Sequence, residues 1–212
     1  MWIPLESNPD MLTTFVRKLG VPAPWHFCDV FGLDEELLQM VPQPCRAVVL
    51  LYPTPQLRAF KEEQRQRVER EGQLLSENLF YMKQHDHVGN ACGTIGTIHA
   101  LANAVEPGDI AQLGEGELRR FVEQQRAAAA DPAQIGEALA QAQGIRTVSE
   151  EAATLYGQTE APPAEEQLEA HFCAFVQVDN NLYELDGRKA FPINHGPTTQ
   201  DPFLVDAARV VR

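Results

Sequence analysis

The clearest helical pattern lies in the middle of the chain. From residue 95 to residue 105, apolar residues recur at steps of three and four positions, as the buried face of a helix requires. Just upstream, Gly89 and Asn90 interrupt the chain, and Asn90 is a good candidate for the N-cap residue. The pattern therefore predicts a buried helix with Cys92 in its first turn.

Further helices are predicted before this segment. Asn8 and the proline after it precede an apolar stripe that runs to Leu19, and Gly20 ends that helix. Residues 34–40 indicate a short helix. Residues 57–75 interleave Lys, Arg and Glu with few apolar positions, which favours a solvated helix over a functional charge cluster.

Two more helices are predicted after a turn at Pro107 and Gly108. Asp131 and Pro132 open the second of them as its cap and first residue, and Gly144 closes it.

Strands are predicted where apolar residues alternate with polar ones or run together. Residues 25–31 alternate well enough for a short strand, and Arg46 to Tyr52 is an apolar run typical of a buried central strand. His171 to Val178 and Asn181 to Asp186 are predicted to form a hairpin, because the Asp-Asn pair between them suits a two-residue turn.

The region from Thr147 to Gly187 is strongly acidic. It contains nine Asp and Glu residues and neither Lys nor Arg. Such a stretch produces a negative field that would attract a cationic substrate, and a merely solvated acidic loop is the alternative. Its first half contains Gly157, Pro162 and Pro163 and has little periodicity, so we predict a long loop, which in compact domains is often a functional lid.

Composition favours a single intracellular domain. The 212 residues are 44% hydrophobic, enough for a real core. The first ten residues do not resemble a signal peptide, and no apolar run approaches membrane-spanning length. We expect a cytoplasmic protein, with the nucleus as a second location. The net charge of -13 argues against binding to nucleic acid or anionic membranes and favours a basic partner.

The cysteines do not suggest a metal or disulfide framework. The chain has four, widely spaced and without a C-x-x-C pair: Cys28, Cys45, Cys92 and Cys173. Reduced thiols in a reducing compartment fit this pattern best, and neither a metal nor a cofactor is expected. Cys28 and Cys45 lie in apolar neighbourhoods, and we interpret both as core residues.

Cys92 is the candidate nucleophile. Unpaired N–H groups and the helix dipole stabilise a thiolate in the first turn of a helix. Gly93 and Gly96 each cost a helix about 1 kcal/mol relative to alanine, and together with Thr94 they leave room for a group to approach the sulfur. The alternative is that Cys92 is an inert, buried packing residue, as free cysteines commonly are.

His171 is the best candidate for a base that would activate this cysteine. If Val178 opposes Asn181 in the hairpin, residue 173 lies opposite Asp186, and His171 and Asp186 become diagonal neighbours on one face. One hairpin would then present an imidazole and the carboxylate that orients it. The alternative is that both are surface residues without a joint role.

The other histidines are weaker candidates. His99 lies about two helical turns after Cys92 and cannot reach its sulfur. His26 and His195 have no evident carboxylate partner. The segment from His85 to His87 faintly suggests a metal site, although such a site needs three or four fixed ligands.

Several collinear motifs closely resemble the ubiquitin carboxyl-terminal hydrolase family of cysteine peptidases. They are WIPLE at 2–6, NACGTIG at 90–96, GQTEAP at 157–162 and LYELDGRKAFPINHG at 182–196. The resemblance covers essentially the whole chain. It implies one catalytic domain over residues 1–212 with a papain-like α/β fold, in which helices flank a central antiparallel sheet and the chain is knotted, an exception to the usual topology.

The resemblance also implies roles for individual residues. Cys92 would be the nucleophile, His171 the general base and acid, and Asp186 the residue that orients His171. Gln84 would donate to the oxyanion together with the backbone N–H of Cys92. The implied reaction is hydrolysis after the terminal glycine of ubiquitin, or of a close ubiquitin-like protein, through a thioester acyl-enzyme.

Residues 150–169 correspond to the crossover loop of the family, which spans the active site and restricts leaving groups to small or unfolded ones. Its acidic residues Glu160, Glu165 and Glu166 are candidate contacts for the arginine-bearing tail of ubiquitin. We expect a monomer.

The sequence departs from the family pattern in two places. Gln84 and Cys92 are eight residues apart, whereas six is usual in the family, so Gln84 either keeps its place beneath a bulged loop or is displaced. The sequence ends at Arg212, where relatives continue to a further apolar strand, so the sheet is expected to lack that strand and to expose an edge.

Two other functions compete with an active deubiquitinase. One is a ubiquitin-binding module with weak or no catalysis, because of Gln84 or the missing strand. The other is a metal-binding protein that uses the segment from His85 to His87.

Overall fold

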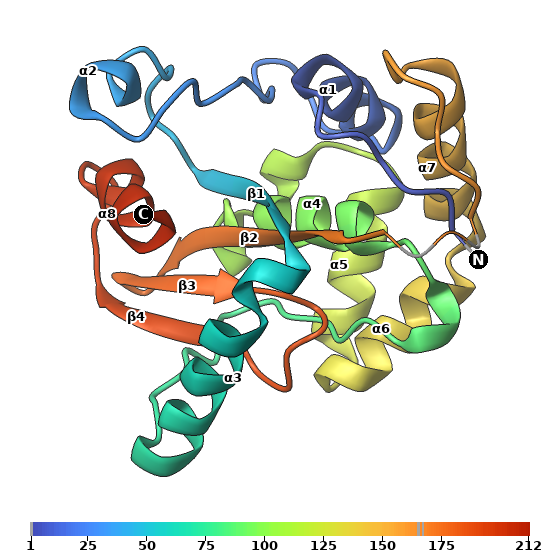
Figure 1. Cartoon of the computed structure of the whole chain (residues 1–212). Coiled ribbons are helices and arrows are strands. Elements are labelled where there is room, and N and C mark those ends of the chain that lie inside the picture. Colours follow the sequence, from blue (N-terminus) through green and yellow to red (C-terminus); the bar gives the residue numbers. More distant parts are fainter. Residues whose placement is uncertain (1, 165, 167) are drawn as a thin grey trace.

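A computed structural model describes residues 2–164, 166 and 168–212 (Figure 1). Within these residues, four strands form one antiparallel sheet in the order β1-β2-β3-β4. The strands are β1 Ala47–Pro53, β2 Ala170–Val178, β3 Asn181–Leu185 and β4 Ile193–Pro197. The α-helices are α1 Pro9–Lys18, α2 Glu35–Leu38, α3 Thr54–Glu71, α4 Cys92–Asn103, α5 Glu117–Ala127, α6 Pro132–Gln141, α7 Gln143–Leu155 and α8 Phe203–Val211. Short 3₁₀ helices cover η1 Asp86–Val88 and η2 Pro107–Leu113.

Helices cover both faces of the sheet, as predicted. Helix α4 packs against β2 and is buried along its whole length. On the opposite face, α8 covers an apolar cluster that includes Cys173 and Phe175 of β2. Because neighbouring residues of a strand point to opposite faces, Ala174 and Val176 turn toward α4. Strand β2 is therefore buried on both sides.

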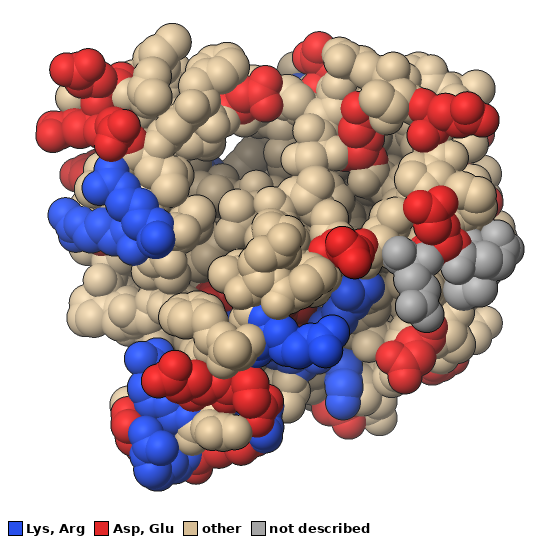
Figure 2. Space-filling model, in the orientation of Figure 1, with Lys and Arg blue, Asp and Glu red and all other residues tan. Residues whose placement is uncertain are grey.

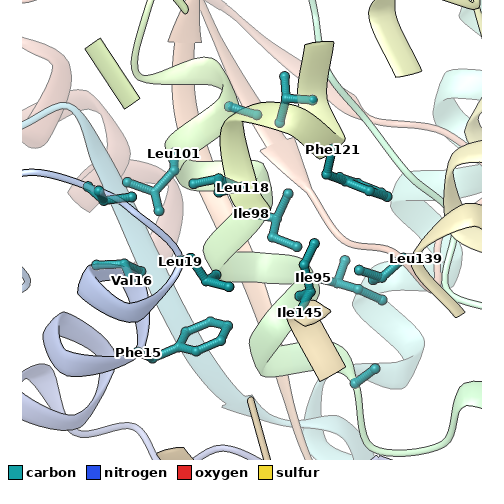
Figure 3. Packing of buried hydrophobic residues seen from close by; sticks show 14 of the residues in the cluster. Phe15, Val16, Leu19, Ile95, Ile98, Leu101, Leu118, Phe121, Leu139 and Ile145 are labelled. Atoms are coloured by element: carbon teal, nitrogen blue, oxygen red, sulfur yellow. The ribbon is translucent and has the colours of Figure 1, made fainter. Parts of the chain in front are cut away.

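The largest core lies beyond α4, between this helix and the helices that surround it (Figure 3). Phe15 of α1 and Leu19, which caps the end of α1, approach Ile95 and Ile98 of α4, and side chains of α5, α6 and α7 extend the cluster. The predicted cap of α1 is present, since the Asn8 side chain accepts a hydrogen bond from the N–H of Met11.

The predicted hairpin is confirmed residue by residue. Val178 pairs with Asn181, and Ala174 pairs with Leu185. Asp179 and Asn180 have φ values of 46° and 59°, the left-handed conformations that a tight hairpin turn requires. This register brings His171 and Asp186 to the same end of the hairpin.

Two strand predictions were wrong in part. Residues 25–31 form no strand, and Cys28 is exposed. The N–H of Phe27 donates to the Thr13 hydroxyl, so a side chain of α1 replaces a strand partner. Strand β1 exists but lies at an edge of the sheet, and half-buried Cys45 precedes it.

Two helix predictions also need correction. Three α-helices, not two, follow residue 114 before the hairpin, and Gly144 lies in the first turn of α7 instead of closing α6. Helix α7 also occupies residues that were predicted as loop. Its buried positions Ile145, Ser149 and Ala152 are spaced four and three apart, so a helical pattern is present, but with small and polar residues in it.

A groove of about 760 Å³ runs beside the free edge of β1. The segment before β1 forms its opposite wall, and Figure 2 shows the surface hollowed there. Basic and acidic side chains mix on the surface of α3 in the same view. Among the helices of the described residues, none is long and apolar enough to cross a membrane.

Replacing Ile98 by alanine tests the position of the core. Ile98 is completely buried, so Ile98→Ala should lower the free energy of unfolding by about 2–5 kcal/mol. Leu155→Ala is the control, because that side chain is 67% exposed and its loss should cost no more than about 0.5 kcal/mol. Urea unfolding measures both, and equal losses would contradict the assignment of α4 to the core.

Candidate active site

Cys92 is the first residue of α4 and is only 6% exposed. The N-cap of the helix is Ala91, not Asn90 as predicted, and no side chain caps this end. The Asn90 side chain instead donates to the carbonyl oxygens of Ala164 and Glu166, at 3.1 and 2.9 Å. Asn90 therefore links the start of α4 to residues 150–169, which were predicted as the crossover loop and are called the crossover segment below.

Gly93 allows close packing of α4. A Cβ added at Gly93 would lie 3.0 Å from the Leu5 side chain and 3.3 Å from the Phe172 ring. At Gly96 it would lie 3.5 Å from the Phe172 Cβ, which is an ordinary contact. That the glycines leave room for a group to approach the sulfur stays a prediction.

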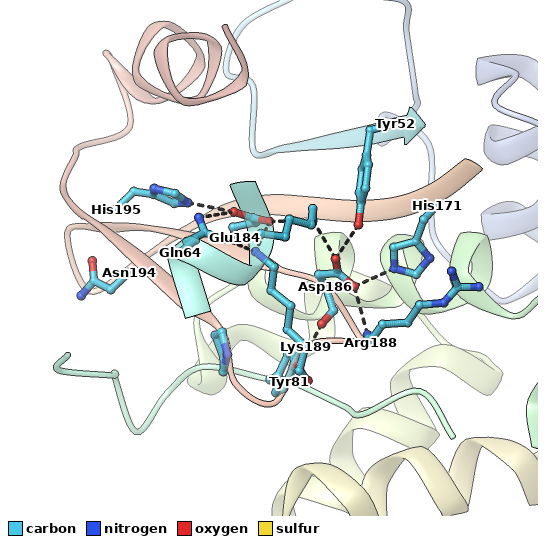
Figure 4. A network of polar contacts seen from close by, with 12 residues as sticks. Tyr52, Gln64, Tyr81, His171, Glu184, Asp186, Arg188, Lys189, Asn194 and His195 are labelled. Carbon is cyan, nitrogen blue, oxygen red and sulfur yellow. Dashed lines mark hydrogen bonds and ion pairs between the residues drawn. The ribbon is translucent and has the colours of Figure 1, made fainter. Parts of the chain in front are cut away.

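The hairpin delivers an imidazole and a carboxylate in contact. Nε2 of His171 lies 2.6 Å from Oδ1 of Asp186, and the two side chains are 1% and 2% exposed. Figure 4 shows this pair beside Tyr52 of β1. The predicted contact between His171 and Asp186 is therefore present, and it lies in the interior instead of on the surface.

The imidazole of His171 interacts with Cys92 as well as with Asp186. Its second ring nitrogen, Nδ1, is buried and has no hydrogen-bond partner among the described residues. Burial alone would raise the pKa of the Cys92 thiol, but the neighbouring His171 imidazole and its charge outweigh burial, so the pKa is lowered. Burial would lower the pKa of His171, yet Asp186 and Cys92 raise it overall. Both shifts favour a thiolate beside an imidazolium.

Four donors converge on the Asp186 carboxylate. Oδ1 accepts from His171 and, at 3.0 Å, from the backbone N–H of Arg188. Oδ2 accepts from the Tyr52 hydroxyl at 2.7 Å and from Nζ of Lys61 at 2.9 Å. Burial would raise the pKa of Asp186, but His171 and Lys61 hold it well below its usual range. The carboxylate is therefore ionised throughout the neutral range.

Glu184 forms a second buried acidic centre next to the first. Its carboxylate contacts Lys189 at 2.6 Å and His195 at 3.1 Å, and it also approaches Lys61 at 3.3 Å. Sequence analysis missed this cluster and assigned His195 no carboxylate partner. The sequence did contain a signal for this cluster. Glu184 and Asp186 are two positions apart, so at the end of β3 two acids face the same side as apolar Leu182.

Gln84 lies near the end of β3, where the chain continues to Gly187. Its backbone N–H donates to the carbonyl of Gly187 at 2.7 Å, while the extra residues form η1. Its side-chain Nε2 donates to the carbonyl of Gly89 at 2.8 Å. Oε1 of Gln84 is buried and lacks a partner in the described part of the chain.

The remaining candidates are less defined. Glu160 and Glu166 are exposed, and Glu165 lies outside the described residues. The rings of His85 and His87 stack with centroids 5.5 Å apart. Among the described residues, no group of three or more His, Cys, Asp or Glu side chains is arranged to hold a metal ion.

The lowered pKa of Cys92 predicts selective alkylation. Burial raises the pKa of Cys28 and takes that of Cys45 to about 11, so their thiolate fractions fall about tenfold for each unit of decreasing pH. Alkylation by iodoacetamide, followed by peptide mass spectrometry, should therefore favour Cys92 over exposed Cys28 more at about pH 7 than at about pH 10, where the Cys28 thiol also becomes ionised. A ratio that does not change with pH would contradict activation of Cys92.

Comparisons with known proteins agree with this geometry. The family model described as "Ubiquitin carboxyl-terminal hydrolase, family 1" matches residues 2–212. A probable ubiquitin carboxyl-terminal hydrolase of Dictyostelium discoideum is 42% identical over 213 residues, covering 100% of this chain and 80% of the relative. Ubiquitin carboxyl-terminal hydrolase isozyme L1 of Homo sapiens is 39% identical over 215 residues, covering 99% of this chain and 89% of the relative.

A solved structure shows the same fold. The crystal structure of the Trichinella spiralis UCH37 catalytic domain, bound to ubiquitin vinyl methyl ester, matches with a TM-score of 0.68 at 22% identity and covers 100% of this chain and 86% of that one. The papain-like fold predicted from the motifs is thereby confirmed. The chain belongs to family 1 of the ubiquitin carboxyl-terminal hydrolases, which are cysteine-type deubiquitinating enzymes.

Proposed function

We propose that this chain hydrolyses small or unfolded adducts from the C-terminal glycine of ubiquitin, with Cys92 as the nucleophile. The observation that supports this most is the buried series of thiol, imidazole and carboxylate formed by Cys92, His171 and Asp186. Without the partners from the hairpin, a cysteine at the start of a helix would be only a packing residue.

The reaction proceeds in two steps. The Cys92 thiolate attacks the carbonyl carbon of the terminal glycine, and the His171 imidazolium donates its proton to the leaving amine as the bond to it breaks, which leaves a thioester. His171 is then neutral and removes a proton from the water that hydrolyses the thioester. Asp186 stays ionised, orients the ring and stabilises the imidazolium, without transferring a proton itself.

The oxyanion has two proposed donors. One is the backbone N–H of Cys92, which lies in the first turn of α4 and is not used inside the helix. The other is the Gln84 amide. Its nitrogen carries two hydrogens, of which one bonds to the Gly89 carbonyl and the second is available to the oxyanion.

The substrate tail is proposed to pass the acidic crossover segment. Glu160 and Glu166 are exposed, and Glu165 belongs to the same acidic sequence. A basic peptide tail would be attracted by this field. Asn90 holds the segment close to Cys92, which supports its role in limiting the size of the leaving group. We propose that the enzyme acts as a monomer.

One observation favours the alternative of a weakly active ubiquitin-binding module. The Gln84 amide is already engaged by Gly89, and its oxygen lacks a partner in the described part of the chain. Tight ubiquitin binding with turnover no faster than that of Cys92→Ala would support this alternative.

Variants of the three central residues test the mechanism. His171→Ala should lower kcat for a ubiquitin C-terminal fluorogenic amide by a factor on the order of 10³ or more, because the Cys92 thiol loses its proton acceptor and the leaving amine its proton donor. Asp186→Asn should impair less, because the orienter transfers no proton. Ubiquitin affinity, measured by calorimetry, should change little in both. Turnover like that of the unmodified protein in His171→Ala would remove that residue from the mechanism.

Salt and charge reversal test the acidic segment. Raising ionic strength should raise the Kd for ubiquitin, because exposed charges are screened beyond about 10 Å at 0.1 M salt. Glu160→Lys with Glu166→Lys should weaken binding and flatten this salt dependence. Glu63→Lys with Glu71→Lys is the control, because it makes the same charge change at two exposed positions of α3. A Kd that does not respond to salt would refute attraction by this segment.

A further inference from the structure

The two oxygens of the Asp186 carboxylate have different partners. Oδ1 faces His171, whereas Oδ2 is occupied by Tyr52 and Lys61, at 2.7 and 2.9 Å. A carboxylate can rotate about its last bond, and a half turn only exchanges two equivalent oxygens. Donors on both oxygens fix the plane of the group, because an orientation between these two would leave donors without an acceptor.

Tyr52 contacts both members of the pair. It lies opposite His171 in the register of β1 and β2, and its ring meets the imidazole edge-on, with centroids 5.6 Å apart and planes at 85°. Its hydroxyl donates to Asp186. Burial and the charge of Asp186 raise the pKa of Tyr52, so the hydroxyl keeps its proton in the neutral range. One side chain thus restrains the plane of the ring and the orientation of the carboxylate.

Lys61 reaches the same oxygen from α3. Its Nζ lies 3.9 Å from the centroid of the Tyr52 ring, which adds a cation–π contact to the ion pair with Asp186. Helix α3 is otherwise largely exposed, and Gln64 is its one buried residue in the described structure. Glu184 also has Lys189 and His195 as partners. The charge of Glu184 therefore does not depend on Lys61, and the shorter ion pair of Lys61 is the one with Asp186.

We propose that Tyr52 and Lys61 are positioning residues that hold Oδ2 of Asp186, so that Oδ1 stays directed at His171. This inference rests on the proposed function of His171 and Asp186. Neither Tyr52 nor Lys61 touches the reacting atoms, and both act through the carboxylate. Their loss should therefore reduce kcat and leave KM nearly unchanged.

Conservative variants of both residues provide the first test. Tyr52→Phe removes one hydroxyl and keeps the ring, and should lower kcat for the fluorogenic ubiquitin amide about 3- to 10-fold, the effect of losing one hydrogen bond of about 1 kcal/mol while the second donor on Oδ2 remains. Lys61→Met should lower kcat at least as much, and Lys61→Arg should restore most of it, because an arginine also donates to a carboxylate.

Matched controls separate positioning from a general loss of polar groups. Tyr183→Phe removes a buried hydroxyl that accepts from the N–H of Ser76 and does not contact Asp186. Lys189→Met removes a cation that contacts Glu184 and Gln64 but makes no ion pair with Asp186. Both controls should keep kcat within about twofold of the unmodified protein. Thermal unfolding of all variants identifies any that are not folded at the assay temperature.

The pH profile gives a readout that a merely structural role would not move. The charged or titratable groups around the pair are Cys92 and His99 on α4, Cys173 on β2, Glu184 on β3, Arg188 and Lys189 after β3, Tyr52 on β1, Lys61 on α3 and Tyr81. If Asp186 turns away, the pKa of His171 falls, and the alkaline limb of kcat/KM moves to lower pH in Tyr52→Phe and Lys61→Met. If the carboxylate stays in place with fewer donors, it holds the imidazolium more strongly and the limb moves to higher pH, which would overturn the proposal.

A double-mutant cycle distinguishes failure of this inference from failure of the proposed function. In the Asp186→Asn background, Tyr52→Phe should have no further effect on kcat, because the group it positions is already absent. Asp186→Asn with unchanged kinetics would reject the proposed role of Asp186 itself. Impairment in Asp186→Asn, combined with unchanged kcat and pH profile in Tyr52→Phe and Lys61→Met, would overturn only the positioning role.

Discussion

The buried negative charge of Asp186 is the constraint on which the site depends. A carboxylate removed from water is costly unless donors and cations surround it. Asp186 receives them from Tyr52 of β1 and His171 of β2, from the backbone N–H of Arg188 and from Lys61 of α3. The same charge raises the pKa of His171, which in turn lowers that of Cys92. The hydrogen bonds and ion pairs of this one carboxylate therefore favour the thiolate form of Cys92, and they also link α3 to the sheet through Lys61.

Local physics made the hairpin and the central helix predictable from sequence. The Asp-Asn turn and the strand alternation determine a register, and the register determines that His171 meets Asp186. The apolar period after Cys92 determines that α4 is buried. The motifs then predicted the family and its fold correctly. The roles of Gln84 and of the acidic segment remain predictions.

The parts that sequence did not predict depend on contacts between distant segments. Lys61 lies in a helix whose pattern is polar, and nothing local shows that one of its cations reaches a carboxylate 125 positions away. The position of β1 at the sheet edge depends on the order of strands that are far apart in the chain. Residues 25–31 alternate like a strand, but side chains of α1 occupy their backbone groups. In each case a tertiary partner overrides the local preference.

The two-residue turn at Asp179 and Asn180 has a consequence for how this chain can change. Side chains along a strand alternate between faces, so shifting one strand of the hairpin by a single position would turn His171 or Asp186 to the opposite side of the sheet. A shift by two positions would restore the face but move the partners apart along the strand. Insertions or deletions in this turn would therefore separate His171 from Asp186, although surface turns elsewhere commonly tolerate such changes in length.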